Sequence, residues 1–190
     1  MVPKETGKWG KRRPAKPLNQ ASLEELALSY AARFATSSTK LAAYLQRKIR
    51  ERGVDDDAGQ IDPQAVVERL VELKYVDDEA YARARAGGLL RRGYGGRRID
   101  QSLRAAGIAD ELLEEISPHE AEARRAALTM ARKRGFGPFG VQPLERDKRE
   151  KQIAAMLRAG HGFDAVREVI DAQSVEQAEQ WLAEAEEEAE

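Results

Sequence analysis

Arginine is the residue type in this chain whose number and spacing best suit binding chemistry. Between residues 83 and 104 there are seven arginines and a single acidic residue. Arg91 and Arg92 precede a glycine-rich turn, and Arg97 and Arg98 follow it. A guanidinium group binds a phosphate or a carboxylate through two parallel hydrogen bonds. If a helical hairpin brings these helix ends together, they form a binding site for a polyanion or for an acidic protein surface.

Basic residues at comparable helix ends extend this candidate site in both directions. A solvated helix normally interleaves both signs of charge, so separated runs indicate one basic stripe that faces a polyanion. The candidate contact residues are Arg47, Lys48, Arg50, Arg91, Arg92, Tyr94, Arg97, Arg98, Arg104, Arg132, Lys133 and Arg134. The alternative for each of them is that it neutralises a carboxylate of the chain itself, including those of residues 171–190, which hold eight acids and no base.

Catalytic and metal-binding chemistry lacks the residues that it needs. The chain has no cysteine and only two histidines, which lie far apart in the sequence. We expect His119 to be an exposed first-turn residue, and His161 to face the last carbonyls of the helix before it. The run of aspartates at 55–57 has no phosphate-binding loop beside it, so a solvated loop is expected. We therefore predict no enzyme activity, no cofactor and no metal site.

The segment 70–116 must position the central arginines, and its pattern predicts a complete three-helix unit. Asp77 or Asp78 can cap the first helix, because an aspartate oxygen accepts the free N–H groups of a first turn. Glycines break the chain after residue 92 and again at Gly107. The predicted helices span 79–92, 97–106 and 109–116. Their narrow apolar faces cannot be buried singly, so the three helices must pack on one another.

Shifted copies of this unit are found on both sides of it. Gly53, Gly107 and Gly160 lie about 50 residues apart, and each has an apolar residue four positions before it. Such spacing is typical of helical repeats, in which each unit contacts only its neighbours. The predicted fold class is all-α, an elongated tandem array of three three-helix repeats.

This pattern divides the chain into five segments. They are a disordered basic leader (1–20), a first three-helix repeat (21–75), a second (76–117), a third (118–172) and an acidic C-terminal helix or tail (173–190). Ordered structure is expected from Ser22, an N-cap with Glu25 at the capping-box spacing. No apolar run approaches the roughly 20 residues of a membrane span, and no apolar signal core is present. We expect a soluble cytoplasmic monomer.

Three strings of the sequence resemble the RecX family of recombination regulators. They are ALSYAARFATSSTKLAAYL, LVELKYVDDEAYARA and RRGYGGRRIDQSLRAAGI, and the similarity spans about 26–170. Members of that family have tandem three-helix repeats. The matching motif residues are Asp77, Asp78, Tyr81, Ala82, Gly95, Arg98 and Ile99. Two positions depart from the family pattern: Lys74 stands where a glycine is usual, and His161 replaces an aliphatic residue.

The resemblance implies a protein that binds the RecA recombinase filament along its helical groove and restrains strand exchange and ATP hydrolysis. It implies no catalysis, a role in DNA repair, homologous recombination and the SOS response, and secondary contact with single- or double-stranded DNA. A different hypothesis is a helical DNA-binding protein that acts without recombinase, since three-helix units often resemble helix-turn-helix modules. A third is a scaffold whose acidic tail mimics DNA.

Overall fold

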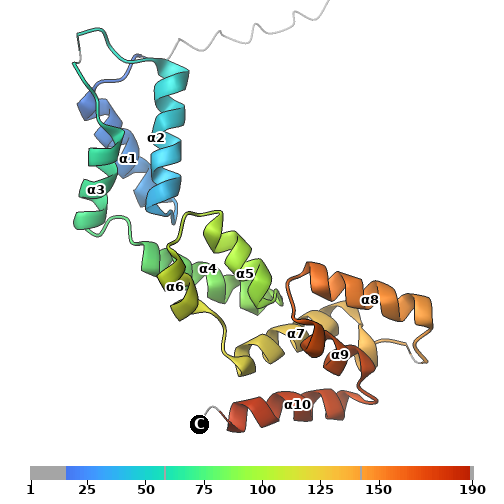
Figure 1. The fold of residues 1–190 in the computed structure, drawn as a ribbon. Helices are drawn as coiled ribbons and strands as arrows, with labels where there is room; N and C mark the ends of the chain where they lie inside the picture. The colour runs from blue at the N-terminus through green and yellow to red at the C-terminus, as the bar shows by residue number, and fades with distance from the viewer. Residues whose placement is uncertain (1–15, 58, 142, 189–190) are drawn as a thin grey trace, which may run out of the picture.

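The protein is all-α and elongated in a computed structural model that describes residues 16–188 except 58 and 142. Figure 1 shows three groups of helices in a row, from α1–α3 at the upper left to α7–α10 at the lower right. The predicted fold class is confirmed. The elements are α1 (Gln20–Arg33), α2 (Ser38–Arg52), α3 (Pro63–Glu72), α4 (Asp78–Arg92), α5 (Gly96–Arg104), α6 (Asp110–Ile116), α7 (Glu120–Arg134), the 3-10 turn η1 (Gly137–Phe139), α8 (Arg146–Arg158), α9 (Phe163–Asp171) and α10 (Val175–Glu187).

Each group of helices encloses a hydrophobic cluster of its own. In each case the buried residues recur at helical spacing, which places them on one face of their helix. The first cluster is formed by Leu18, Leu23, Ala27, Leu41, Leu45, Val66, Val67, Leu70 and Val76. The second is formed by Ala82, Ala86, Leu89, Ile99, Leu103, Ala106, Ile108 and Leu113. The third is formed by Ala127, Leu128, Met130, Ala131, Met156, Ala159, Val166, Val169, Ile170 and Ala178.

The ordered chain begins before Ser22, so the expected start of structure is wrong. Leu18 is fully buried, and its N–H donates to the carbonyl of Gly53 at 2.9 Å. The side chain of Asn19, not of Ser22, caps α1 by accepting a hydrogen bond from the N–H of Ser22. A single apolar residue among polar ones shows no period, so its burial could not be predicted locally. Residues 1–15 of the predicted leader lie outside the described residues.

The first hydrophobic cluster extends one residue past the predicted end of the first repeat at residue 75. Val76, which the sequence assigned to the second repeat, is buried in the first cluster. The chain turns there through Lys74, whose φ of 59° is the single positive value among the described non-glycine residues. The left-handed conformation costs an L-residue about 1–2 kcal/mol, which explains why glycine suits this position better.

The acidic C-terminal segment is a docked helix. Ala178 and Ala185 of α10 are buried, and Trp181 packs against the third cluster. Arg124 of α7 donates to the carbonyl oxygen of Trp181 at 2.6 Å and lies 4.7 Å from the centre of its ring. The predicted acidic helix therefore forms part of the third group of helices.

Side-chain hydrogen bonds join the first group of helices to the second. Asp77 caps α4 through the N–H of Ala80. Asp78 instead reaches the start of α2, where it accepts from the N–H and the hydroxyl of Ser38 at 2.7 and 2.6 Å, next to the N-cap Ser37. The fully buried hydroxyl of Ser37 donates to the carbonyl of Ala106 at 2.6 Å. The two neighbouring aspartates thus serve two different helices, one in each group.

Backbone contacts join the second group to the third. The N–H of Gly95 donates to the carbonyl of Ala159 at 3.0 Å, and that of Arg97 donates to Gly160 at 3.1 Å. A Cβ at Gly95 would overlap the backbone of Gly160, so the two chain segments touch directly. His161 is buried here and its Nε2 donates to the carbonyl of Gly93 at 3.0 Å. The expectation that it faces its own helix was wrong, because it reaches the end of α4 instead.

Candidate functional site

A basic groove lies where the first and second groups of helices meet. It has a volume of about 450 Å³. The residues that line it are Lys40, Arg85, Leu89, Arg92, Tyr94, Arg98, Gln101, Ser102 and Ala105. They include four cations and no carboxylate. We call this site the basic groove.

Helical spacing explains how two of its walls form. On α4, Arg85, Leu89 and Arg92 are four and three residues apart, and therefore lie on one face. Residues 98, 101 and 102 of α5 and residue 105, the C-cap of that helix, follow the same pattern. The glycine turn between the helices folds these two faces toward one groove. Lys40 reaches it from the first turn of α2, whose position is set by Asp78.

The cations of the basic groove are oriented by neutral acceptors. Arg85 donates to the hydroxyl of Ser102 at 3.0 Å, and Arg98 donates to the side-chain oxygen of Gln101 at 2.7 Å. Arg92 donates to the carbonyl of Gly88 at 3.1 Å, and the ammonium of Lys40 is bonded to the hydroxyl of Tyr81. These bonds fix the direction of each group but leave its positive charge intact.

None of these four cations forms an ion pair with a described residue, in contrast to several other basic residues of the protein. All four side chains are exposed to solvent. An anion entering the groove would therefore meet cationic side chains that are already oriented and not paired with a described carboxylate. Several N–H groups of these side chains can still donate to it. The arrangement suits a phosphate backbone or a carboxylate-rich surface.

The predicted basic residues of α2 are partly paired within their own helix. Arg47 and Lys48 both pair with Glu51, at 3.7 and 2.6 Å. The hydrogen bond from Lys48 is the main reason why the pKa of Glu51 lies below its ordinary value. Arg50 is exposed and has no ion pair with a described residue. This set therefore offers less free charge than its sequence indicated.

Arg104 is neutralised as well. Its guanidinium pairs with Asp100, one turn earlier on α5, at 3.1 Å and also with Asp110 at the start of α6. These two carboxylates, Asp100 above all, raise the pKa of Arg104 above its ordinary value. The alternative interpretation of the arginines, internal pairing, holds at this position.

Some of the basic residues of the third group pair with carboxylates of α10. Arg132 pairs with Glu179, and Arg125 of the same helix pairs with Glu186 at 2.6 Å. Lys133 donates to the carbonyl of Arg91 at 3.1 Å, which ties α7 to α4. Arg134 lies 6.0 Å from the ring centre of Phe136. The acidic helix thus takes up part of the charge of α7.

The turn arginines do not all converge, contrary to the prediction. Arg92 and Arg98 share the basic groove with Tyr94, whose ring centre is 5.7 Å from the guanidinium of Arg92. Arg91 instead lines a hollow between α4 and α7, and Arg97 lines one between α5 and α6. Successive residues on a helix point about 100° apart, so adjacent arginines cannot face one groove.

Sequence reasoning missed Lys40, Arg85, Gln101 and Ser102. The helical spacing of Arg85 and Arg92 could have identified the missing arginine. The two polar residues of α5 follow from Arg98 by the same rule. Nothing local points to Lys40, because its place depends on the contact between two repeats.

Groups of histidine, aspartate and glutamate that could hold a metal ion are not found in the part of the chain that the structure describes. None of the helices there combines the length and the hydropathy that a membrane span requires. The site is therefore characterised by its charge. Fold and site together define an elongated helical-repeat protein with a cation-lined groove at a junction of two groups of helices.

Comparison with known proteins specifies the family. The family model described as RecX, second three-helix domain, matches residues 77–115. The chain is 34% identical to the regulatory protein RecX of Myxococcus xanthus over 171 residues, which cover 85% of this chain and 90% of that protein. A regulatory protein RecX of Thermus thermophilus is 35% identical over 137 residues, covering 72% and 83%. The chain belongs to the RecX family.

Solved structures agree on the fold. A crystal structure of RecX from Lactobacillus salivarius superimposes with a TM-score of 0.59 at 16% identity, covering 80% of this chain and 94% of that one. A crystal structure of a regulatory protein RecX gives a TM-score of 0.52 at 20% identity, covering 80% and 74%. At these identities the likeness concerns the helical architecture alone.

Proposed function

We propose that this protein binds the RecA–DNA filament along its helical groove and restrains strand exchange and ATP hydrolysis. It acts in the cytoplasm, as a monomer and without catalysis of its own, within DNA repair, recombination and the SOS response. Membership in a family whose relatives are named regulatory proteins supports this function. The elongated form also supports it, because a row of repeats can follow a helical furrow over a long distance (Figure 1).

The observation that carries the proposal is the basic groove with its four unpaired cations. Charges that no described residue neutralises are available to an external anion, whereas Arg104 and Arg132 are already paired. A nucleoprotein filament presents both phosphates and carboxylates. The groove is large enough for a phosphate and its sugar but not for a duplex, so the contact is with one backbone strand or one acidic loop at a time.

The two junctions between repeats fix the walls of the groove relative to each other. Asp78 holds the start of α2, which carries Lys40, and the backbone contact with Gly160 lies beside Arg98. Prealigned charges lose less conformational freedom on binding than mobile ones do. Weak contacts along an elongated surface then add up without any one of them being strong.

Measuring ATP hydrolysis by the recombinase on single-stranded DNA, titrated with this protein, tests the proposal. The variant Arg85→Glu, Arg92→Glu, Arg98→Glu should lose about 100-fold or more in apparent affinity for the filament while its helical content stays unchanged. A charge-matched control is Arg33→Glu, Arg146→Glu, Lys148→Glu, which changes exposed cations outside the groove. Equal inhibition by both variants would show that the groove is not the contact surface.

The second candidate function is a DNA-binding protein that acts without recombinase. The cation-lined groove favours this too, because phosphate contacts alone supply non-specific DNA binding. This second function predicts tight binding to naked DNA and no effect on ATP hydrolysis by the recombinase. The affinity for DNA should fall steeply with salt, and the triple groove variant should reduce the slope of log affinity against log salt by about 3. Retention on filaments at a salt concentration that removes the protein from free DNA would favour the first function.

A further inference from the structure

We propose that the first repeat carries a second binding site, a docking groove for a short basic amphipathic helix of a partner protein. The groove lies between α1 and α3, has a volume of about 510 Å³ and is separate from the basic groove. The residues that line it are Gln20, Ala21, Glu24, Glu25, Leu28, Ala65, Val66, Arg69, Leu70, Leu73 and Tyr75. We call it the α1–α3 groove.

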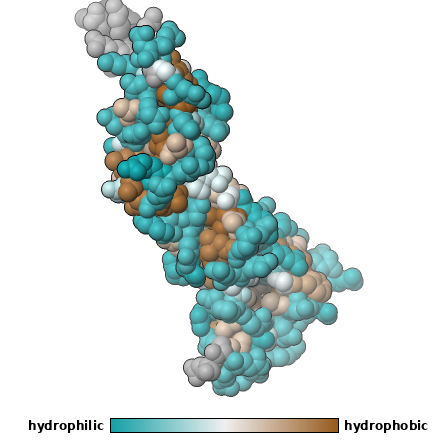
Figure 2. All heavy atoms as spheres, turned by 60° about the vertical axis from the view of Figure 1, so that its left-hand side comes forward, coloured by the Kyte–Doolittle hydropathy of each residue, from teal (hydrophilic) through white to brown (hydrophobic). Residues whose placement is uncertain are grey.

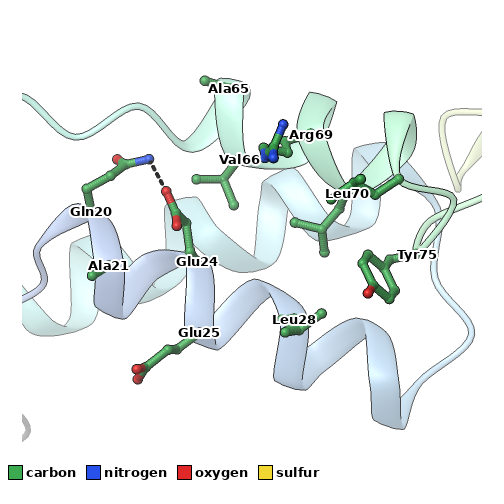
Figure 3. Close-up of a pocket in the computed structure, with 11 residues that line it drawn as sticks. Gln20, Ala21, Glu24, Glu25, Leu28, Ala65, Val66, Arg69, Leu70 and Tyr75 are labelled. Atoms are coloured by element: carbon green, nitrogen blue, oxygen red, sulfur yellow. Dashed lines mark hydrogen bonds between the residues drawn. The ribbon is translucent and has the colours of Figure 1, made fainter.

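The shape of the α1–α3 groove fits a helix. Gln20 and Ala65, near the starts of α1 and α3, lie at one end, and Leu28 and Tyr75 lie at the other (Figure 3). The two walls therefore run in parallel. From residue 20 to residue 28 an α-helix rises about 12 Å, which is about two turns of a docked helix. A groove between two parallel helices is a common seat for an amphipathic third one.

Large apolar side chains are exposed along this groove. Leu28 is 46% exposed, Leu73 52% and Tyr75 60%. Figure 2 shows hydrophobic patches among hydrophilic residues on the face of the first group of helices that is turned to the viewer. Single exposed leucines are ordinary, but three large side chains along one hollow make a contiguous apolar surface. Below them Val66 and Leu70 are buried and give the groove an apolar floor.

The turn after α3 holds Tyr75 on this surface. Lys74 adopts a left-handed conformation, which directs the N–H groups of both Tyr75 and Val76 to the carbonyl of Leu70, at 2.9 and 3.2 Å. Val76 is consequently buried while Tyr75 stays outside. The chain keeps Tyr75 in place at the cost of a strained residue. An amphipathic ring, apolar in its body and polar at its tip, suits the rim of an interface.

The charges of the groove select the kind of partner. Glu24 and Glu25 line one wall, and Arg69 is the single cation among the described residues of the lining. Glu24 accepts a hydrogen bond from the side-chain amide of Gln20 at 3.1 Å, which Figure 3 draws as a dashed line. A partner helix with aliphatic residues on one face and lysine or arginine toward the Glu24 end would complement this pattern. A second copy of the same groove would bring like charges together.

Binding of a labelled peptide to the full chain tests the docking groove. The probe is a helical peptide of about 14 residues with leucines at positions i, i+4 and i+7 and lysines at one end. At about 0.15 M salt we expect saturable binding, measured by fluorescence anisotropy. Replacing the terminal lysines by glutamate, or scattering the leucines around the helix, should weaken it about tenfold.

Substitutions in the groove give the second arm of this test. Leu28→Ser with Tyr75→Ser should weaken peptide binding about tenfold or more, and Glu24→Gln with Glu25→Gln about threefold. The control is Val141→Ser, at a valine that is 91% exposed and outside the groove, which should bind like the parent. All these residues are exposed, so the fold should be retained. Inhibition of recombinase by the variants should stay at the parent level, which separates this proposal from the proposed function.

Three results would overturn the proposal. One is equal binding of the leucine-scattered and the amphipathic peptides. Another is a concentration-dependent dimer that Leu28→Ser dissociates, which would make a second copy the occupant. The third is peptide binding that appears only after removal of residues 1–15, which would show that the groove is filled by the chain itself.

Discussion

The two junctions between repeats are made of different chemistry. Between the first and second repeats, the contacts are hydrogen bonds of side chains, chiefly Asp78 on Ser38 and Ser37 on Ala106. Between the second and third repeats, backbone touches backbone at Gly95 and Gly160. When two repeats move apart slightly, a side chain can replace its lost hydrogen bond by one to water. Two backbone segments in direct contact lose that contact as soon as they separate. The first junction should therefore be the more adjustable one.

This difference bears on the basic groove, which draws residues from both sides of the first junction. Lys40 belongs to the first repeat, and Arg85, Arg92 and Arg98 belong to the second. A change at the first junction would move Lys40 relative to the arginines. A change at the second junction would instead disturb the backbone beside Arg98. Breaking each junction in turn separates these two effects.

The largest effect is expected at the second junction. Gly95→Ala should lower the free energy of unfolding by about 3 kcal/mol, because the added Cβ overlaps the backbone of Gly160. The φ of Gly95 is −83°, so the loss reflects the close contact and not backbone strain. Urea unfolding followed by circular dichroism measures it. Gly88→Ala, inside α4 and without such a contact, should raise stability by about 0.5–1 kcal/mol. Similar changes in the free energy of unfolding for Gly95→Ala and Gly88→Ala would contradict the close contact between Gly95 and Gly160.

A smaller effect is expected at the first junction. Asp78→Ala should lower the free energy of unfolding by about 1–2 kcal/mol, since it removes the two hydrogen bonds that Ser38 donates at the start of α2. Hydrogen exchange at the N–H of Ser38 should become faster. Asp77→Ala removes the cap of α4 at the N–H of Ala80, and should leave exchange at Ser38 unchanged. If Asp77→Ala speeds exchange at Ser38 as much as Asp78→Ala does, the two aspartates do not act on separate helices.

The smallest effect is a pH dependence of the second junction. Burial lowers the pKa of His161 below its ordinary value of 6.5, with the bond to Gly93 opposing this in part. Below pH 6.5 the unfolded chain therefore binds the proton more readily, and the free energy of unfolding falls as the pH drops toward the lowered pKa. The contribution of His161 to the free energy of unfolding is complete above about pH 6.5. The part of it that is lost at about pH 6 stays below about 1 kcal/mol.

Urea unfolding at several pH values between about 8 and 5 measures this dependence. The variant His161→Gln should show a flatter profile, because it removes the titrating group and keeps a donor for Gly93. His119→Gln is the control, since His119 is exposed as predicted. A profile of His161→Gln as steep as that of the parent would assign the pH dependence to other groups.

The helices of the second repeat could be predicted closely because their signals are local. Residue 92 ends the first helix, where Gly93 takes a φ of 87°, and the second and third begin within one residue of the expected positions. The burial of Leu18 and of Val76 could not be predicted in the same way. Leu18 lies outside a periodic run and bonds to Gly53, which is distant in the sequence, and Val76 follows the left-handed turn at Lys74. That each repeat folds as a separate unit, with boundaries near 75 and 117, stays a proposal.

The candidate site could be predicted in part. Arg92, Tyr94 and Arg98 were expected to lie together and do. Arg91 and Arg97 have the same residue type and almost the same position in the sequence, but they face other hollows. A count of arginines measures total charge and says nothing of the direction in which each side chain points. The pairing of Arg132 with Glu179 also needed the docking of α10, because 47 residues separate the partners.

Local sequence signals were enough for the helices, the threefold repetition and the family resemblance, because apolar spacing and helix-ending glycines act over a few residues. Which cations remain free and which surfaces stay uncovered depended on how the repeats pack. Ion pairing requires short distances between side chains of different helices, and those distances are set when the repeats come together. The basic groove arises at that level, whereas the α1–α3 groove is set by how the helices of the first repeat pack on one another.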